Sequence, residues 1–447
     1  MTPRELMSGV DAAWLHMDRP ENTADVVALM TFRERLTIEE VRRVIEERFV
    51  SHPRFRQRIV PDGLFALAAW DDDPHFDLSR HVVERAVHAK GSRALDRLAG
   101  EVATEKLDPA HPLWRIYLVT GHGAGSALVV KLHHCIADGF ALVGLLLSMS
   151  DEMAPHTQAP VPHRMPAYKD LRLAEPPGLA LWRALSDRAR AADLAARGIA
   201  FARSLASMTA LPYAPRTALS RPLSGLRRTA WSRGIPLPEL KITARRLGST
   251  VNDLLVTALA GALRGHLRDA KEPVDALELR ALVPVNLRDH LPADLDGEMG
   301  NRFGLVFLDL PIRAAGALTR LEAVRARMEQ LKRTPDAVVT YAVLAALGHL
   351  PQPLEHLVTE FFSRKAALVL TNVPGPRQPL HLAGHEIRRI MFCVPHPAAL
   401  GLGVSILSYA GEVRIGARAD VAVMRDPGDL VRRIPAELEA LSQIATA

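Results

Sequence analysis

Two adjacent histidines and an aspartate are the side chains of this sequence best suited to moving a proton. They are His133, His134 and Asp138, in the stretch His-His-Cys-Ile-Ala-Asp-Gly at positions 133–139. The ordinary pKa of an imidazole is about 6.5, so a neutral ring can accept the proton of a hydroxyl group at neutral pH. The pattern therefore predicts general-base chemistry, in which the nearby carboxylate holds the loop or the ring in place.

Other interpretations of the same residues stay open at this point. Adjacent histidines can be polar turn residues, and Asp138 can simply cap the helix that follows. A shared metal ion fits less well, because neighbouring side chains on a strand point to opposite faces. Cys135 could be a nucleophile, but it follows an apolar strand and suits buried packing equally. The chain contains no Gly-x-Ser-x-Gly pentapeptide and no glycine-rich phosphate loop, which favours direct transfer without a covalent intermediate.

Alternating apolar residues predict the strands that must position this motif. We expect strands at 26–32, 114–119 and 127–133, with a glycine-rich loop joining the last two into a hairpin. The histidines then stand at the end of a strand, before an amphipathic helix that carries Leu142, Leu145, Leu146 and Met149. Thr37 and Glu40 form a capping box that predicts another helix in this mixed α and β region.

Bulk properties narrow the class of protein. The 447 residues suffice for two domains of about 200 residues each, and 48% hydrophobic with 24% charged residues is typical of compact folds. The net charge is +6, and the basic residues are scattered along the chain, which argues against nucleic acid as a partner. Two cysteines, Cys135 and Cys393, provide no disulfide framework, so we expect a reducing, cytoplasmic compartment. The start lacks a signal-peptide core, and no apolar run is long enough to span a bilayer.

A composition change near the middle predicts two lobes. Four prolines between positions 154 and 166 break both periodic structures, and an Ala-, Leu- and Arg-rich run follows at 179–208. We expect an N-terminal lobe at 1–170, a helical linker at 171–215 and a C-terminal lobe at 216–447. In that lobe Thr250 and Asp253 cap a helix with leucines every four residues, and a last helix follows Asp429. The expected strands are 277–287, 303–310, 366–370, 387–394, 404–409 and 412–417.

The His-His-x-x-x-Asp-Gly motif resembles that of the bacterial wax ester synthase/diacylglycerol acyltransferase family. Further blocks agree in order with this family: Pro-Leu-Trp-Arg at 112–115, Val-Asn-Asp-Leu-Leu at 251–255 and the expected turn Thr-Asn-Val-Pro-Gly-Pro at 371–376. The opening Ser-Gly-Val-Asp at 8–11 and the Ser-Tyr-Ala-Gly at 408–411 extend the resemblance over essentially the whole chain. The histidine motif alone is shared with peptide-synthetase condensation domains and polyketide-associated acyltransferases.

The resemblance implies the fold and the roles of the site residues. The fold would be α/β (α+β), with two chloramphenicol-acetyltransferase-like lobes, each a mixed sheet with flanking helices, and a tunnel between them. His134 would be the general base, His133 would support the loop, and Asp138 would pair with Arg288. Residues expected to bind substrate are Gly139, Asn252, Asn286 and Arg288. Acyl-CoA would be a co-substrate, and neither a cofactor nor a metal is expected.

The implied activity is transfer of a long-chain acyl group from acyl-CoA to the hydroxyl of diacylglycerol or a long-chain alcohol. The family usually carries a Met-His-Val-like stretch where this chain reads Thr-Ala-Asp-Val-Val at 23–27, which leaves the acceptor open. Alternatives are a polyketide, glycolipid or amine acceptor, or a non-catalytic acyl-CoA-binding homologue. Water-insoluble acceptors and the arginines of the 179–208 run suggest peripheral contact with the inner membrane face or lipid droplets, although that run also suits a linker between lobes.

Overall fold

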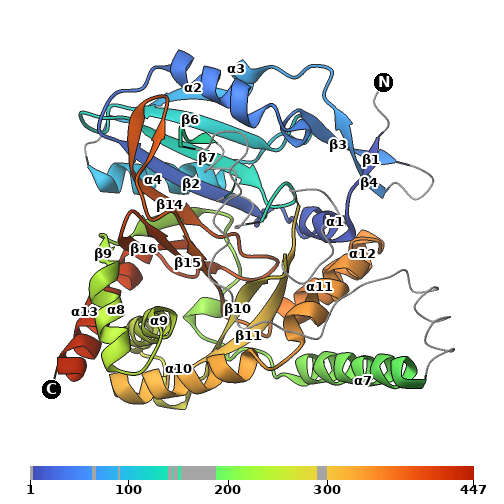
Figure 1. Cartoon of the computed structure of the whole chain (residues 1–447), viewed down its shortest axis with the longest axis vertical. Coiled ribbons are helices and arrows are strands. Elements are labelled where there is room, and N and C mark those ends of the chain that lie inside the picture. Colours follow the sequence, from blue (N-terminus) through green and yellow to red (C-terminus); the bar gives the residue numbers. More distant parts are fainter. Residues whose placement is uncertain are drawn as a thin grey trace.

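The computed structural model describes residues 4–62, 67–88, 91–138, 144, 149–152, 188–288 and 300–446, and these form two sheet-rich lobes (Figure 1). One six-stranded sheet lies in the upper, N-terminal lobe of Figure 1, and one seven-stranded sheet lies in the lower, C-terminal lobe. Both are mixed sheets flanked by helices, so the predicted α/β class is confirmed.

The N-terminal sheet places the histidine motif at the end of a central strand. Its order is β13-β14-β2-β7-β6-β5. The bounds are β2 Asp25–Phe32, β5 Val82–Ala86, β6 Trp114–Thr120, β7 Ala127–His133, β13 Leu380–Leu382 and β14 His385–Cys393. As predicted, β6 and β7 form an antiparallel hairpin. Every residue of β2 and of β7 is buried, because both faces of this sheet are covered.

Helices and a small sheet cover the N-terminal sheet. α4 (Ser92–Thr104) buries its apolar face against β2 and β7, and the other side of the sheet packs on α1 (Gly9–His16) and α2 (Ile38–Val44). The predicted capping box of Thr37 and Glu40 is present at the start of α2. The remaining elements are α3 Leu78–His81 and the three-stranded sheet of β1 Glu5–Leu6, β4 Leu67–Asp72 and β3 Gln57–Asp62.

The C-terminal sheet has the order β11-β10-β12-β15-β16-β8, with β9 paired to β16. The bounds are β8 Arg227–Trp231, β9 Ile235–Pro236, β10 Leu279–Asn286, β11 Phe303–Leu310, β12 Leu368–Pro374, β15 Leu402–Tyr409 and β16 Glu412–Asp420. All of the strands predicted for this half are therefore present. The expected turn at 371–376 is wrong, because residues up to Pro374 continue β12 alongside β15.

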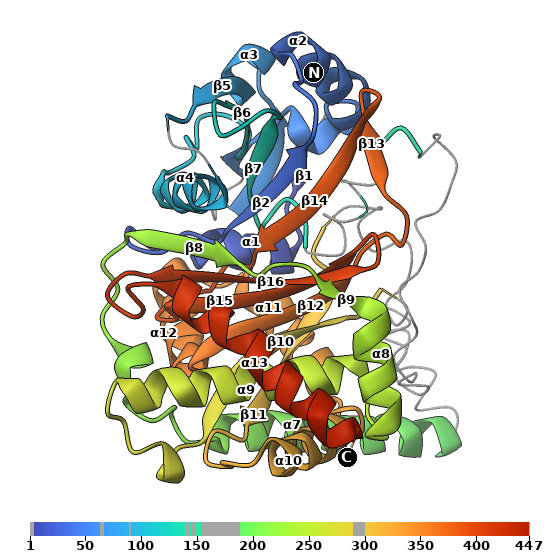
Figure 2. The same ribbon diagram turned by 90° about the vertical axis from the view of Figure 1, so that its left-hand side faces the viewer.

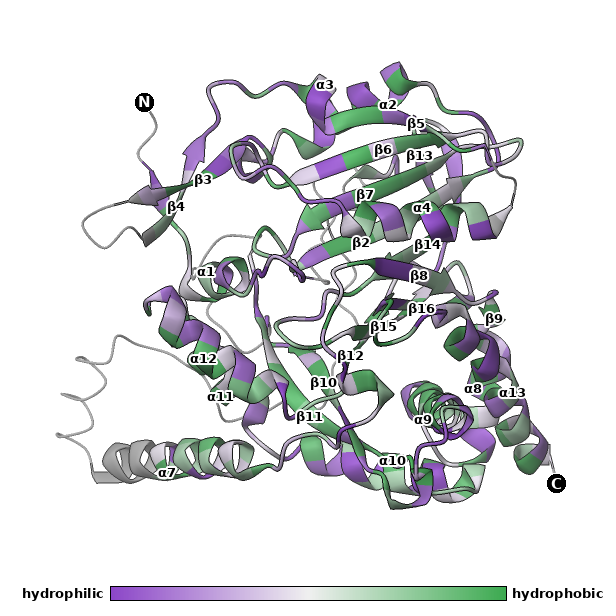
Figure 3. Ribbon diagram, turned by 180° about the vertical axis from the view of Figure 1, so that it is seen from behind, coloured by the Kyte–Doolittle hydropathy of each residue, from purple (hydrophilic) through white to green (hydrophobic). Residues whose placement is uncertain are grey.

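Helices enclose the C-terminal sheet on two sides. α8 (Leu237–Arg246), α9 (Val251–Asp269), α10 (Ala317–Leu331) and α13 (Pro427–Thr446) form one layer, with α9 and α13 crossing the sheet in Figure 2. α9 begins at the predicted capping box, and its repeated leucines are buried. α7 (Arg188–Ala210), α11 (Asp336–Leu347) and α12 (Gln352–Ser363) lie on the other side. Figure 3 shows hydrophobic residues concentrated on the strands of both sheets and on α9.

One segment of the C-terminal half belongs to the N-terminal sheet. β14 pairs antiparallel with β2, and β13 extends the same edge, so residues 380–393 cross from one lobe to the other. The predicted lobe and linker boundaries stay a prediction, but the division in space does not follow chain order alone. The Pro-rich stretch, the linker residues before 188 and most of the predicted helix at 142–149 lie outside the described residues.

Candidate active site

His134 lies directly after β7 and faces a cavity between the two lobes. Its backbone N–H donates to the carbonyl of Ala24 at 2.8 Å, which ties the motif to the start of the neighbouring β2. The space between the wall atoms of this cavity is about 590 Å³, including the part that is open to solvent. Its lining comes from both lobes: Trp14, Val26, His134, Asp138, Leu282, Pro284, Phe303, Leu305, Val369, Thr371, Val373, Phe392, Val394, Pro395 and Pro397. The wall is thus mostly apolar, with the imidazole among its few polar groups.

The surroundings of His134 favour its neutral form. The imidazole stacks on the indole of Trp14, with centroids 4.2 Å apart, and meets the ring of Phe303 edge-on at 5.5 Å. Burial lowers the pKa of His134 to about 4, although the charge of Asp138 partly opposes this shift. At neutral pH the ring therefore has a free lone pair, which is what a general base requires.

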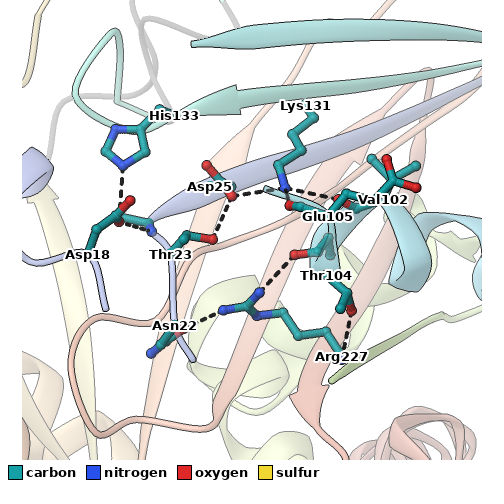
Figure 4. Close-up of polar contacts among 12 residues, drawn as sticks. Asp18, Asn22, Thr23, Asp25, Val102, Thr104, Glu105, Lys131, His133 and Arg227 are labelled. Carbon is teal, nitrogen blue, oxygen red and sulfur yellow. Dashed lines mark hydrogen bonds and ion pairs between the residues drawn. The ribbon is translucent and has the colours of Figure 1, made fainter. Parts of the chain in front are cut away.

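His133 turns to the opposite side of the loop. Its Nε2 lies 3.1 Å from Oδ1 of Asp18 (Figure 4). Its Nδ1 accepts the backbone N–H of Cys135 at 3.2 Å. Because Nδ1 is an acceptor, the ring proton is on Nε2, where it is donated to Asp18. This arrangement holds the loop and gives His133 no access to the cavity through either nitrogen. Nothing in the local sequence identifies Asp18 as the partner.

Asp138 is held by an arginine of the other half of the chain. Its two carboxylate oxygens accept from one guanidinium nitrogen of Arg288 at 2.9 and 2.7 Å, and Oδ2 also accepts the backbone N–H of Arg302 at 2.9 Å. The predicted pairing with Arg288 is therefore present, and it joins the lobes beside the cavity. A carboxylate engaged in this way is suited to holding the loop rather than to taking a proton.

The residues predicted to bind substrate are only partly brought together. Asn286 caps the backbone N–H of Arg288 at 3.1 Å and so supports the ion pair. The Oδ1 of Asn252 accepts from Nδ2 of Asn372 at 2.7 Å. Because Asn372 alternates along β12 with Thr371 and Val373, which line the cavity, this amide pair lies on the opposite face of the strand. Gly139 lies outside the described residues.

Two residues that the sequence reasoning missed support the loop of His134. Asn301 donates its backbone N–H and its Nδ2 to Oδ1 of Asp11, at 3.1 and 2.6 Å, and the same Nδ2 donates to the carbonyl of His134 at 2.8 Å. Burial raises the pKa of Asp11 to about 6. Asp11 belongs to the opening block of the chain, but no pattern links it to Asn301, which is 290 residues away.

A second cavity, with about 610 Å³ of space between its wall atoms including the part open to solvent, adjoins the first. It shares Leu282, Leu305 and Pro397 with the cavity of His134. The rest of its lining comes mainly from α7, α11 and α12: Met17, Leu205, Met208, Phe307, Thr340, Val343, Leu344, Leu347, Thr359, Phe362 and Ser363. The three hydroxyl groups among these donate to backbone carbonyls of their own helices. This second cavity therefore suits a hydrocarbon chain rather than a polar ligand.

The alternative of a cysteine nucleophile finds no support in the geometry. Cys135 and Cys393 are both buried free thiols. Burial raises the pKa of Cys135, and it raises the pKa of Cys393 to about 12. A thiol that stays protonated is a poor nucleophile. Within the described ranges, no group of three or more His, Cys, Asp or Glu side chains is placed to hold a metal ion.

Comparison with known families now places the chain. The model of the wax ester synthase/diacylglycerol acyltransferase catalytic domain matches residues 7–255, and that of the WS/DGAT C-terminal domain matches residues 299–442. The chain belongs to the wax ester synthase/diacylglycerol acyltransferase family. It is an enzyme of the acyltransferase class. The two histidines and Asp138 lie within the matched regions, whereas Leu282 and Pro284 of the cavity wall lie between them.

Individual relatives agree with this assignment. A putative diacylglycerol O-acyltransferase of Mycobacterium bovis and a probable one of Mycobacterium tuberculosis are each 31% identical over 402 residues, which is 87% of this chain and 84% of theirs. The wax ester synthase/diacylglycerol acyltransferase structure from Marinobacter aquaeolei VT8 superposes with a TM-score of 0.70 at 20% identity, covering 99% of this chain and all of that one. A condensation domain of the calcium-dependent antibiotic synthetase gives a TM-score of 0.60 at 15% identity, over 100% and 97% of the two chains. These last two likenesses concern the fold.

Proposed function

We propose that this family member transfers a long-chain acyl group from acyl-CoA to the hydroxyl of diacylglycerol or, second in order, of a long-chain alcohol. The observation that carries the proposal is the neutral, buried imidazole of His134 in a cavity that adjoins a second, mostly apolar one. The names of the mycobacterial relatives favour diacylglycerol as the first acceptor to test. The name of the Marinobacter protein includes wax ester synthase, so a long-chain alcohol is the second acceptor to test.

The chemistry follows from the position of one base beside an apolar wall. The acceptor hydroxyl oxygen attacks the thioester carbon while His134 takes the hydroxyl proton, and the carbonyl π electrons move to oxygen. The tetrahedral intermediate collapses to the ester and expels the CoA thiolate, which takes the proton back from the imidazolium. Because burial lowers the pKa of His134, its imidazolium is a strong acid and returns the proton readily.

The apolar lining contributes in two further ways. It keeps bulk water away from the thioester, so that the acceptor hydroxyl rather than water is the nucleophile. The adjoining second cavity would hold a hydrocarbon chain, and the shared residues Leu282, Leu305 and Pro397 would mark the passage between reacting centre and chain. His133 and Asp138 would hold the loop through Asp18 and Arg288.

The second cavity also indicates how an insoluble acceptor could arrive. Exposed large apolar side chains gather on and next to α7, α11 and α12: Ile199, Phe201, Tyr213, Leu350, Leu354 and Leu357. These helices line the second cavity, so a lipid surface resting on them would be close to its wall. We infer peripheral contact there; of the helices that the structure describes, none has the length and hydropathy to cross a bilayer. Leu354→Glu with Leu357→Glu should reduce co-flotation with anionic vesicles.

The test is release of CoA thiol by the purified full-length chain. Long-chain acyl-CoA with diacylglycerol or hexadecanol should give thiol release that depends on the acceptor. His134→Ala should lower kcat on the order of 100- to 10,000-fold, the range attributed to a general base. His122→Ala, in the loop between β6 and β7, is the matched histidine control and should retain activity.

Other outcomes separate the alternative functions. Acyl-CoA binding without thiol release for any acceptor would indicate a non-catalytic homologue. Turnover of a hydroxylated polyketide, a glycolipid or an amine, with none of simple alcohols or diacylglycerol, would indicate a different acceptor class. Full activity in His134→Ala would contradict the proposed base.

A further inference from the structure

Two buried polar atoms beside the reacting centre have no hydrogen-bond partner. They are Nδ1 of His134 and Oδ1 of Asn301. Both side chains are buried, at 6% and 3% exposure. An imidazole nitrogen can donate and an amide oxygen can accept, so the two atoms are chemically complementary. Buried groups of this kind call for an explanation, because leaving them unpaired is unfavourable.

The orientation of the Asn301 amide is determined by its other contacts. Its Nδ2 donates to Oδ1 of Asp11 at 2.6 Å and to the carbonyl of His134 at 2.8 Å. Both of these partners are acceptors, and together they use both amide hydrogens. Exchanging the amide oxygen and nitrogen would place the oxygen against these two acceptors. The amide oxygen must therefore lie on the side that faces neither Asp11 nor the carbonyl of His134. The Asn301 side chain also opposes, in part, the lowering of the pKa of His134 by burial.

Asp11 and Trp14 anchor this arrangement from a single helix. They are three residues apart on α1, so their side chains share one face. Trp14 stacks on the imidazole of His134, and Asp11 receives both the backbone and the side-chain donor of Asn301. Trp14 thus holds the imidazole face of His134, and Asn301 holds the backbone carbonyl of the same residue. The connection spans both halves of the chain.

We propose that Asn301, held by Asp11, is a positioning residue that accepts the Nδ1 proton of His134 and so leaves Nε2 as the atom that takes the acceptor's proton. This inference rests on the proposed role of His134. A neutral imidazole with its proton on Nε2 would present a donor where the reaction needs an acceptor. The competing acceptor for the Nδ1 proton is the backbone carbonyl of His134 itself, and the experiment below separates the two.

Asn301→Leu keeps a side chain of similar size and removes the amide. We expect kcat to fall on the order of 100-fold, while KM for acyl-CoA stays unchanged. Asp11→Asn removes the charge of the anchor but keeps an oxygen acceptor, so it should lower kcat less. Asp73→Asn is the matched control, since Asp73 is a similarly buried carboxylate that accepts a backbone N–H elsewhere in the N-terminal lobe, and it should retain kcat.

The tautomer of His134 can be measured directly, and Asn301→Leu should not change it if Asn301 has only a structural role. ¹⁵N NMR of histidine-labelled protein, with His134→Ala used to assign the signal, should show the proton on Nδ1 in the wild type. In Asn301→Leu the proton should move to Nε2 or divide between both nitrogens. An unchanged tautomer or wild-type kcat in Asn301→Leu would overturn the proposal in favour of the backbone carbonyl.

Failure of the proposed function is distinguishable from failure of this inference. The NMR measurement needs no substrate, so it reports on Asn301 even if the acceptor has been chosen wrongly. If Asn301→Leu does not fold, as judged by its melting transition, Asp11→Asn carries the same test with a smaller expected effect. Loss of thiol release in the wild type itself would concern only the proposed function.

Discussion

The residues around His134 explain why a histidine in an apolar wall can still be a base. Trp14 and Phe303 cover the ring and exclude water, which disfavours the charged imidazolium. The charge of Asp138, which also accepts from Arg288 and from the backbone N–H of Arg302, opposes this effect only in part. The result is a ring that stays neutral at neutral pH, as the proposed general base must.

The pH dependence of kcat/KM tests this account of His134. Since burial lowers its pKa to about 4, the base should stay unprotonated as the pH falls through the usual histidine range. We expect kcat/KM to be level from about pH 8 to about pH 5 and to fall only as the pH approaches 4. An imidazole of ordinary pKa would instead give a fall centred near about 6.5. That outcome would contradict the account.

Asp11 is the control for this profile. Burial raises its pKa to about 6, so it takes up a proton within the range in which His134 stays neutral. A fall in kcat/KM near pH 6 that disappears in Asp11→Asn would come from this carboxyl group. A fall that persists in the variant would have to come from another group.

The ion pair between Asp138 and Arg288 should be needed for stability. Asp138 is 1% exposed, so Arg288→Met leaves a buried carboxylate without its cation. We expect the free energy of unfolding, measured by urea titration, to fall by about 3–5 kcal/mol. Arg288→Met combined with Asp138→Asn should recover part of this loss, because the uncompensated charge is gone. If the single and the double variant lose the same free energy of unfolding, the charge of Asp138 does not account for the loss.

At the scale of elements, α1 has a larger part than its eight residues suggest. It contributes Asp11 and Trp14 to the site, and it is seated against α11 at two glycines. A Cβ at Gly9 would lie 2.0 Å from the carbonyl oxygen of Ala345, and one at Gly348 would lie 1.8 Å from that of Gly9. Only glycine allows this approach. The helix that holds His134 therefore rests directly on a helix that lines the second cavity.

The lining of the second cavity provides a test of chain binding. Leu205, on α7, points into its wall, and Leu205→Trp should fill part of the volume. We expect kcat/KM for long acyl-CoA to fall at least about 10-fold while that for short acyl-CoA is retained, because only the longer chain needs the space. Ile242→Trp, at an exposed position of α8, is the matched control. An equal loss for all chain lengths would place the chain elsewhere.

At the scale of the whole molecule, a buried polar network joins the two lobes behind the motif (Figure 4). Arg227 of β8 donates to the carbonyl of Ala103 at 2.9 Å and to Oδ1 of Asn22 at 3.0 Å. Nearby, Lys131 of β7 pairs with Asp25 at 3.0 Å. The network lies on the side to which His133 turns, so the first histidine of the motif faces this network and the second faces the cavity.

Loss of Arg227 should loosen this interface. Arg227→Met leaves buried acceptors on Ala103 and Asn22 unpaired, and each such group costs about 1–3 kcal/mol. We expect a lower free energy of unfolding by a few kcal/mol and a lower kcat, since the cavity is built from both lobes. Arg425→Met, at an exposed arginine, is the control. Unchanged stability in Arg227→Met would show that the network does not hold the lobes together.

The sequence by itself determined the local features of this protein. The strands around the motif, the capping boxes at Thr37 and Thr250 and the family itself were all predicted, because apolar periodicity and helix caps depend on residues only a few positions apart. The pairing of Asp138 with Arg288 was also predicted, although only through the resemblance to the family. It could not be obtained from spacing, since 150 residues separate the partners.

Only the tertiary structure decided which distant segments meet. It brought Asn301 to Asp11 and His134, and it paired Asn252 with Asn372 on the face of β12 that points away from the cavity. It also placed β14 in the N-terminal sheet and built the second cavity mainly from α7, α11 and α12. No short pattern encodes these contacts, because each depends on how two lobes and their helices pack against each other. The motif that carries His134 could therefore be found in the sequence, but Asp11 and Asn301, which hold its loop, had to be found in the fold.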